Sequence, residues 1–227
     1  MGETAQPKTS RLKGWIDGFA AYGDRRVATM LVLGFSSGMP LILIFATMSR
    51  WLAEAGVSRT EIGIFSLVGL AYGFKFVWAP AVDHVRLPWL HRSMGRRRSW
   101  VLLSQATVIA GIVGMAFTSP ASALGVMAVF AVVTAFAGAT QDIAIDAWRI
   151  ESAPKEMQGA MAGAYQLGYR LALLAGGAGV FFIVAVLQDG VNGLGLAAWR
   201  FGYLAMAGAM LLGVGAILYA REPVARV

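Results

Sequence analysis

Long apolar stretches alternate with short polar segments along the chain. Six stretches are about as long as a membrane-spanning helix, which needs roughly 20 mostly apolar residues. They cover approximately residues 27–51, 60–82, 99–118, 123–148, 158–187 and 201–220. The stretches are too long and too uniformly apolar for the alternating strands of a membrane barrel. The pattern therefore predicts an all-α membrane protein with six transmembrane helices.

The composition agrees with this prediction. Hydrophobic residues make up 58% of the chain and charged residues only 14%, whereas a soluble domain typically has about 25% charged residues. We predict a basic cytoplasmic tail over residues 1–26, the six-helix bundle over 27–220, and the start of a cytoplasmic linker over 221–227. The tail lacks the short apolar core and the small-residue cleavage site of a signal peptide.

The basic residues predict the orientation of the helices. If both termini lie in the cytoplasm, the inner segments hold most of the arginines and lysines, and the outer segments hold only Arg50, Arg59 and Arg200. This asymmetry follows the positive-inside rule. The net charge of +7 is therefore assigned to orientation in the lipid bilayer, and no nucleic-acid partner is expected.

Apart from Arg50 and Glu61 at the outer ends, four charged residues fall inside the predicted helices, namely Lys75, Asp142, Asp146 and Arg170. Each costs about 2.5–3.5 kcal/mol on insertion scales, so such groups are expected to pair and to face the bundle interior or a wet cavity. Together the two cations and two anions can nearly neutralise one another. Intramembrane ionisable residues usually mark a transport pathway or a proton relay. The alternative is structural ion pairing between helices; Asp146 also suits a pair with Arg149 or with the loop after the second helix.

The segment GFSSGMP, residues 34–40, departs from the apolar pattern of the first helix. Pro40 lacks a backbone donor and disfavours a straight helix, while Gly34 and Gly38 are spaced for close contact with another helix. A broken helix of this kind often lines the substrate site of a transporter. A packing kink without a binding role explains the same residues equally well.

Other chemistries have little support. The chain has no cysteine, and neither His84 nor His91 has metal-ligand spacing with a carboxylate, so no metal and no cofactor are expected. Motifs of ATP-driven pumps and of hydrolases are also absent from the sequence. A membrane enzyme acting on lipid-linked cell-wall precursors would have to use Asp146 with His84, which makes it the least favoured alternative.

The loop between the second and third helices resembles the signature of the major facilitator superfamily. Asp83 ends the second helix, and Gly95, Arg96, Arg97 and Arg98 precede the third. The resemblance implies a gate at the inner side of the membrane, in which Asp83 pairs with the basic cluster and with helix ends. A plain positive-inside cluster would explain the arginines, but not their combination with Asp83.

Five longer motifs resemble one family within that superfamily. In order, they read GFSSGMPL, IGIFSLVGLAYGFKFVWAP, GRRRSW, ATQDIAIDAWR and LGYRLALL. They closely resemble AmpG-type muropeptide permeases, and related acetyl-CoA transporters share weaker versions. The resemblance covers roughly residues 27–223 and implies the N-terminal six-helix half of such a permease. It also implies proton-coupled import of N-acetylglucosaminyl-1,6-anhydro-N-acetylmuramyl peptides through the bacterial inner membrane for cell-wall recycling.

The motif positions indicate which residues form the site. Those assigned to substrate binding are Gly34, Gly38, Lys75, Ala139, Gln141 and Arg170. Lys75 and Arg170 are expected to attract the carboxylates of an anionic glycopeptide, and Gln141 to hydrogen-bond a sugar or an amide. Asp142 is expected to exchange the proton, with Asp146 as the second candidate, so that the proton gradient supplies the energy.

The family has two six-helix halves, whereas this chain has one. Because a transporter of this type holds its substrate between two halves, one half alone cannot enclose it. We expect the chain to pair with a separate second half or to form a homodimer. The alternative is a truncated or partner-dependent membrane protein without transport activity of its own.

Overall fold

The computed structural model describes residues 23–189 and 194–223. Over these residues all regular structure is helical, and six helical segments are long and apolar enough to cross a membrane. They are Arg25–Glu54, Arg59–Val77, Arg96–Ala116, Pro120–Ser152, Lys155–Gln188 and Gly195–Tyr219. The predicted all-α class and the six spans are confirmed. Residues 1–22 and 224–227, which make up most of the predicted tail and linker, lie outside the described residues.

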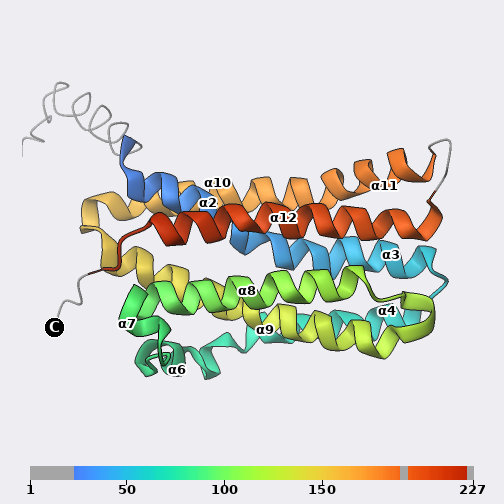
Figure 1. Cartoon of the computed structure of the whole chain (residues 1–227), viewed down its shortest axis with the longest axis horizontal. Helices are drawn as coiled ribbons and strands as arrows, with labels where there is room; N and C mark the ends of the chain where they lie inside the picture. Colours follow the sequence, from blue (N-terminus) through green and yellow to red (C-terminus); the bar gives the residue numbers. More distant parts are fainter. Residues whose placement is uncertain (1–22, 190–193, 224–227) are drawn as a thin grey trace, which may run out of the picture.

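The spans run side by side along one axis (Figure 1). The first consists of α2 (Arg25–Ile42), a π-helical turn (Leu43–Thr47) and α3 (Met48–Glu54). The third and fourth are α8 (Arg96–Ala116) and α9 (Pro120–Ser152). The fifth consists of α10 (Lys155–Leu174), a second π-helical turn (Ala175–Gly179) and α11 (Val180–Gln188). The sixth is α12 (Ala198–Tyr219), which follows a 3₁₀ turn (Gly195–Ala197).

The second span is interrupted several times. It consists of α4 (Arg59–Phe65), a 3₁₀ turn (Ser66–Gly69), α5 (Leu70–Gly73), a second 3₁₀ turn (Lys75–Val77) and α6 (Ala79–His84). The sequence predicted one span over residues 60–82, and the structure adds that its helix is irregular. Gly69 and Gly73 close two of the helical pieces, and glycine is a poor helix former. As a result, Lys75 lies in an irregular turn rather than in a regular helix.

The start of α2 and the end of α12 lie at the same end of the bundle (Figure 1). Helices α6 and α7 (Leu90–Met94) lie at this end as well. An even number of spans returns the chain to the side from which it entered. We call this end the terminal end, and the ends of α3, α8 and α11 lie at the opposite end.

Two apolar clusters follow one another along the helices in the bundle interior. On α2, for example, Leu33 belongs to the cluster nearer the terminal end and Met39 to the other. Between them lie Ser36 and Ser37, which are completely buried. The same order holds on α8 and α9, where a buried glutamine separates the two clusters. A buried polar layer therefore crosses the bundle.

Helices α2 and α10 contact one another backbone to backbone. A Cβ atom at Gly34 would overlap the carbonyl oxygen of Tyr165, and one at Gly38 would overlap that of Tyr169. From the other side, a Cβ atom at Gly168 would overlap the backbone of α2. The close helix contact predicted for Gly34 and Gly38 is confirmed, since only glycine permits this approach.

The first span stays helical through Pro40, which corrects the predicted break at residues 34–40. The irregular turn follows directly after α2, at Leu43–Thr47. There the hydroxyl of Thr47 donates to the carbonyl oxygen of Gly176 at 2.7 Å, and the hydroxyl of Tyr203 donates to that of Leu43 at 2.8 Å. Hydroxyl groups of neighbouring helices thus satisfy carbonyl groups in two adjacent π-helical turns, as the absence of water in the bilayer core requires.

Candidate functional site

The buried polar layer is built around the hydroxyl of Ser36. Gln105 on α8 and Gln141 on α9 each donate an amide hydrogen bond to Ser36 Oγ, at 3.1 and 3.2 Å. Gln141 also donates to Ser37 Oγ at 3.3 Å. All four side chains are buried. Gln141, which the sequence assigned to substrate binding, therefore lies between helices rather than at an open surface.

Asp142 lies at the edge of this layer, where α9 contacts the second span. Its carboxylate is 3.8 Å from Nζ of Lys75, and the hydroxyl of Tyr165 on α10 donates to it at 3.4 Å. The side chain of Asp142 is 11% exposed and that of Lys75 is 39% exposed. The pair thus combines a nearly buried anion with a cation that reaches open space. Because 3.8 Å is longer than a hydrogen bond, the ammonium keeps donors for a second anion.

Three tyrosines surround this ion pair, and the sequence did not single them out. Tyr165 and Tyr169 are one turn apart on α10, with ring centroids separated by 6.2 Å. Tyr72 comes from α5, and its hydroxyl, which has no hydrogen-bond partner among the described residues, lies against Gly138 on α9. Such side chains combine an apolar ring with a hydroxyl group, which suits a sugar. The four-residue spacing on the fifth span is the sequence signal that could have found two of them.

The other predicted site residues lie apart from the Lys75–Asp142 pair. Asp146 is half-exposed and pairs with Arg149 at 3.4 Å, which is one of the alternatives that the sequence left open. Arg170 is exposed on α10, and no carboxylate of the described residues lies within ion-pair distance of it. The expected pairing of the intramembrane charges is therefore confirmed for Lys75 and Asp142. It is wrong for Asp146, which has a nearer partner on its own helix, and for Arg170. Ala139 is completely buried.

The two groups of the acid–base pair that the enzymatic alternative requires are both engaged by other residues. His84 Nδ1 donates to the carbonyl oxygen of Pro80 at 2.8 Å, while the carboxylate of Asp146 is paired with Arg149. Each group is therefore held by a neighbour on its own segment. Among the described residues, no group of three histidine, aspartate or glutamate side chains could hold a metal ion.

Asp83 and the arginines of the predicted gate meet at the terminal end. The guanidinium of Arg97 donates to Asp83 on α6 at 2.7 Å and also to Glu151 on α9. Arg96 lies 3.7 Å from the same glutamate. Arg97 is only 6% exposed, so one buried arginine connects the second, third and fourth spans. The pairing of Asp83 with the basic cluster agrees with the sequence, which did not predict the role of Glu151.

Glu222, just after α12, completes this network and was not predicted. Its two carboxylate oxygens accept from the backbone N–H groups of Arg97 and Arg98, at 2.8 and 3.1 Å, and so cap the start of α8. Arg98 in turn donates to two carbonyl oxygens in the last turn of α12, at 2.9 and 2.7 Å. Gly95 has a φ of 83°, and a side chain at this position would overlap Glu222. The end of the sixth span is thereby tied to the start of the third.

Replacing Arg97 by lysine is expected to lower the free energy of unfolding by about 1–3 kcal/mol, because lysine keeps the charge but cannot donate to two carboxylates in a fork. The matched control is Arg96→Lys. Arg96 is 31% exposed and makes only a long ion pair, so its replacement should change stability by less than about 0.5 kcal/mol. Thermal unfolding of the purified variants in detergent measures both effects. Equal losses in the two variants would contradict a special role for Arg97.

Six apolar helices that hold an ionisable pair within the spanning region, with a charged network at one end, define a multi-pass membrane protein of the transporter type. A family model described as acetyl-coenzyme A transporter 1 matches residues 26–123. The anhydromuropeptide permease of Escherichia coli (strain K12) is 40% identical over 198 residues, which are 87% of this chain and 38% of the relative. A putative transporter AmpG 4 of Rickettsia felis is 33% identical over 165 residues, which are 73% of this chain and 40% of the relative.

The chain belongs to the AmpG-type permease family, as its motifs predicted. It spans about two fifths of the length of the curated relatives that it matches. These relatives are transporters rather than enzymes, in agreement with the sequence.

Proposed function

We propose that this chain forms one half of a secondary transporter that imports anhydromuropeptides, together with protons, across the bacterial inner membrane for peptidoglycan recycling. The observation that carries the proposal is the Lys75–Asp142 ion pair inside a chain that is 40% identical to an anhydromuropeptide permease. Ionisable pairs within the membrane are costly to bury and usually mark a substrate pathway or a proton relay.

The chemistry around the ion pair suits an anionic glycopeptide. In this proposal the ammonium of Lys75 binds one substrate carboxylate, and the exposed guanidinium of Arg170 binds a second. The rings of Tyr165 and Tyr169 pack against a sugar, whose hydroxyls bond to the tyrosine hydroxyls. An anion with sugar rings and several carboxylates can occupy all of these groups at once.

The remaining predicted residues support the site from behind. Gly34, Gly38 and Ala139 are buried between helices, where their small size lets the backbones approach. Gln141 holds the two serine hydroxyls beside Asp142. In this proposal they fix the positions of α2, α9 and α10, and they make no contact with the substrate.

Asp142 couples substrate movement to proton movement. In the empty transporter its carboxylate neutralises Lys75. A substrate carboxylate that binds Lys75 displaces this partner, and a nearly buried carboxylate without a counter-ion takes up a proton. Release of the substrate restores the ion pair and frees the proton. Lys75 thus binds the carboxylate of Asp142 and the carboxylate of the substrate in turn. This alternation couples substrate movement to proton movement without any further group.

We place both termini in the cytoplasm, because the arginines and lysines concentrate on that side. The terminal end then faces the cytoplasm, and the Asp83–Arg97–Glu151 network, continued by Glu222, becomes the inner gate. Opening towards the cytoplasm requires these contacts to separate. Gly95, Arg96 and Arg98 belong to the same gate.

A second six-helix half, or a second copy of this chain, completes the transporter. The second and fifth spans leave large apolar side chains uncovered, including Phe76 at 67% and Leu174 at 64% exposure. The chain also spans only 38% of the Escherichia coli relative. Substrate enclosed between two halves that rock against each other is the usual arrangement of such transporters.

Uptake of a labelled anhydromuropeptide into inner-membrane vesicles tests the proposal. The chain is produced alone and together with the part of the Escherichia coli relative that it does not match. We expect uptake driven by a proton gradient when a second half is present, and its loss when the gradient is collapsed. Uptake by the chain alone, with a native mass of two copies, would favour the homodimer.

A membrane protein without transport activity is the second candidate, because the chain covers less than half of its relatives. This candidate predicts that the chain is a monomer by native mass spectrometry and that it shows no uptake, either alone or together with the second half. That combination of results would reject the transport proposal.

A further inference from the structure

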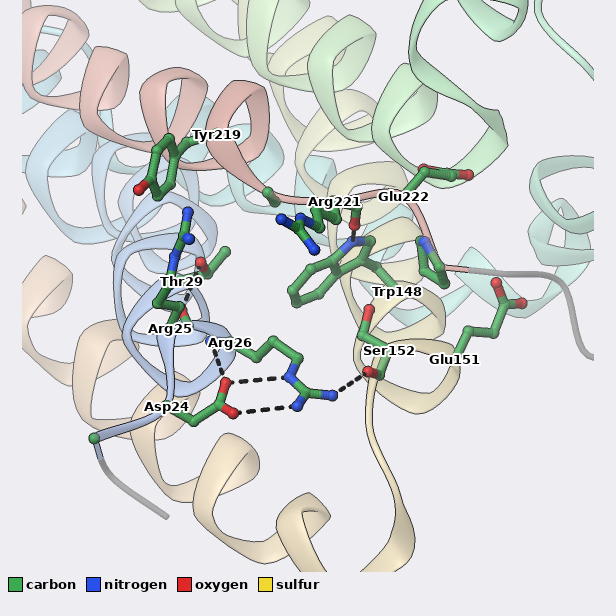
Figure 2. A pocket seen from close by; sticks show the side chains of 13 residues that line it. Asp24, Arg25, Arg26, Thr29, Trp148, Glu151, Ser152, Tyr219, Arg221 and Glu222 are labelled. Atoms are coloured by element: carbon green, nitrogen blue, oxygen red, sulfur yellow. Dashed lines mark hydrogen bonds and ion pairs between the residues drawn. The ribbon is translucent and has the colours of Figure 1, made fainter. Parts of the chain in front are cut away.

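A cavity of about 860 Å³ opens at the terminal end, and neither Lys75 nor Asp142 lines it. It lies between the start of α2, the end of α9 and the segment that follows α12 (Figure 2). The lining combines three arginines, three acidic residues and two aromatic residues. Glu151 and Glu222 also belong to the proposed gate, but none of the lining residues belongs to the proposed substrate site, so the cavity requires its own explanation.

The three acidic residues of the lining are already engaged. Asp24 pairs with Arg26 at 3.1 Å and accepts its backbone N–H at 2.7 Å, and these hydrogen bonds hold the pKa of the Asp24 carboxyl below its ordinary value. Glu151 accepts two hydrogen bonds from Arg97. Glu222 accepts the backbone N–H groups at the start of α8. The formal charges of the lining cancel, but Asp24 and Glu151 are paired with arginines, and Glu222 is held by backbone N–H groups.

Two guanidinium groups of the lining have no carboxylate partner among the described residues. Arg25 lies over the ring of Tyr219, with its Cζ atom 4.3 Å from the ring centroid. Arg221 follows α12, and its backbone carbonyl accepts the indole N–H of Trp148 at 3.1 Å, which fixes the chain at this point. Figure 2 shows both guanidinium groups on the Tyr219 side of the cavity, away from the Asp24–Arg26 pair. The cavity therefore presents two guanidinium groups that no carboxylate of the described residues binds directly.

We propose that this cavity binds the phosphate headgroup of an anionic membrane lipid. Arginine binds phosphate oxygens with two parallel hydrogen bonds, and basic pockets between spanning helices bind anionic headgroups. The ends of α2, α9 and α12 are the level at which spanning helices leave the hydrocarbon core. Tyr219, which is 69% exposed, is a typical side chain for this interface.

A lipid suits the cavity better than a free phosphate does. The volume exceeds that of one phosphate and leaves room for the glycerol that a headgroup carries. The exposed ring of Tyr219 lies beside the guanidinium of Arg25, so a ligand there meets a cation and an apolar surface together. The inference does not depend on transport, and the proposed orientation decides only which leaflet supplies the lipid.

The test counts lipids that bind to the purified full chain by native mass spectrometry, using phosphatidylglycerol and phosphatidylcholine. The double variant Arg25→Gln with Arg221→Gln is compared with the control Arg59→Gln with Arg200→Gln. Both control arginines are exposed at the opposite end, and Arg200 also lies over an aromatic ring. We expect a preference for phosphatidylglycerol that falls roughly tenfold in the first variant and stays unchanged in the control. An equal preference in all three proteins would overturn the proposal.

Two further measurements identify the occupant. Inorganic phosphate and glycerol phosphate are added as competitors, and neither should displace phosphatidylglycerol at millimolar concentration; displacement would assign the cavity to a free phosphate. A photoreactive benzoylphenylalanine in place of Tyr219 should form an adduct with the mass of the lipid. An adduct only with a peptide from residues 1–22 would assign the cavity to the chain itself. Melting temperatures of both double variants serve as the control for folding.

Discussion

Replacing Asp142 by asparagine is expected to abolish the accumulation of anhydromuropeptide against its gradient. Asparagine keeps the shape and can still accept the hydroxyl of Tyr165, but it cannot carry a proton or neutralise Lys75. The initial rate of uptake should therefore fall by roughly tenfold or more, while exchange of substrate across the membrane without a proton gradient persists.

The measurement uses liposomes that contain the chain with its second half. Uptake driven by a proton gradient is compared with exchange at equal pH on both sides. The comparison variant is Asp146→Asn, on the same helix and one turn away, where the carboxylate is half-exposed and pairs with Arg149. We expect this variant to retain gradient-driven uptake. A variant pattern in which Asp146 matters and Asp142 does not would transfer the coupling role to Asp146.

A second large effect is expected at the contact between α2 and α10. Replacing Gly168 by alanine places a methyl group on the backbone of α2, and the two helices must separate to admit it. Overpacking of this kind costs about 1–3 kcal/mol and sometimes more. We expect a clearly lower melting temperature in detergent and a loss of correctly folded protein in the membrane.

The control lies on the same helix. Gly159 has open space where its Cβ would be, so Gly159→Ala should be neutral or should stabilise the protein by up to about 1 kcal/mol through its helix propensity. The pair separates packing from propensity, because both changes replace glycine by alanine within α10. Equal stability of the two variants would show that α2 and α10 are not in backbone contact.

The motif between the second and third spans shows how much of an ion-pair network a short sequence pattern can predict. Asp83 and the three arginines are recognisable from their order alone, and the structure does join Asp83 to Arg97. The same pattern could not reveal that Arg97 is shared with Glu151, or that Glu222 caps α8. These acids are 54 and 125 residues away from Arg97 along the chain. The spacing of residues within a short motif cannot indicate a partner so far away along the sequence.

The tyrosines beside the ion pair illustrate a second limit. A tyrosine in an apolar stretch looks like any aromatic residue that packs in a bilayer. Only the four-residue spacing of Tyr165 and Tyr169 separates two of the three from the rest, and nothing in the sequence separates Tyr72. Their positions become clear only in the folded chain, where the hydroxyl of Tyr165 reaches the carboxylate of Asp142 and the hydroxyl of Tyr72 lies against Gly138. By contrast, the position of the buried charges was visible in the sequence, because a charge within an apolar run of 20 residues is costly and rare.

By itself, the sequence determined the number of spans, their approximate bounds, the family and the few ionisable groups inside the membrane. The thickness of the hydrocarbon core sets the length and hydropathy of the spans locally and makes charges within them rare, and the family follows from short sequence motifs. Only the tertiary structure decided which of those groups meet. It paired Asp142 with Lys75 and Asp146 with Arg149, and it left Arg170 exposed. The reason is physical, since pairing depends on how each helix is rotated and how closely glycines allow its neighbours to approach.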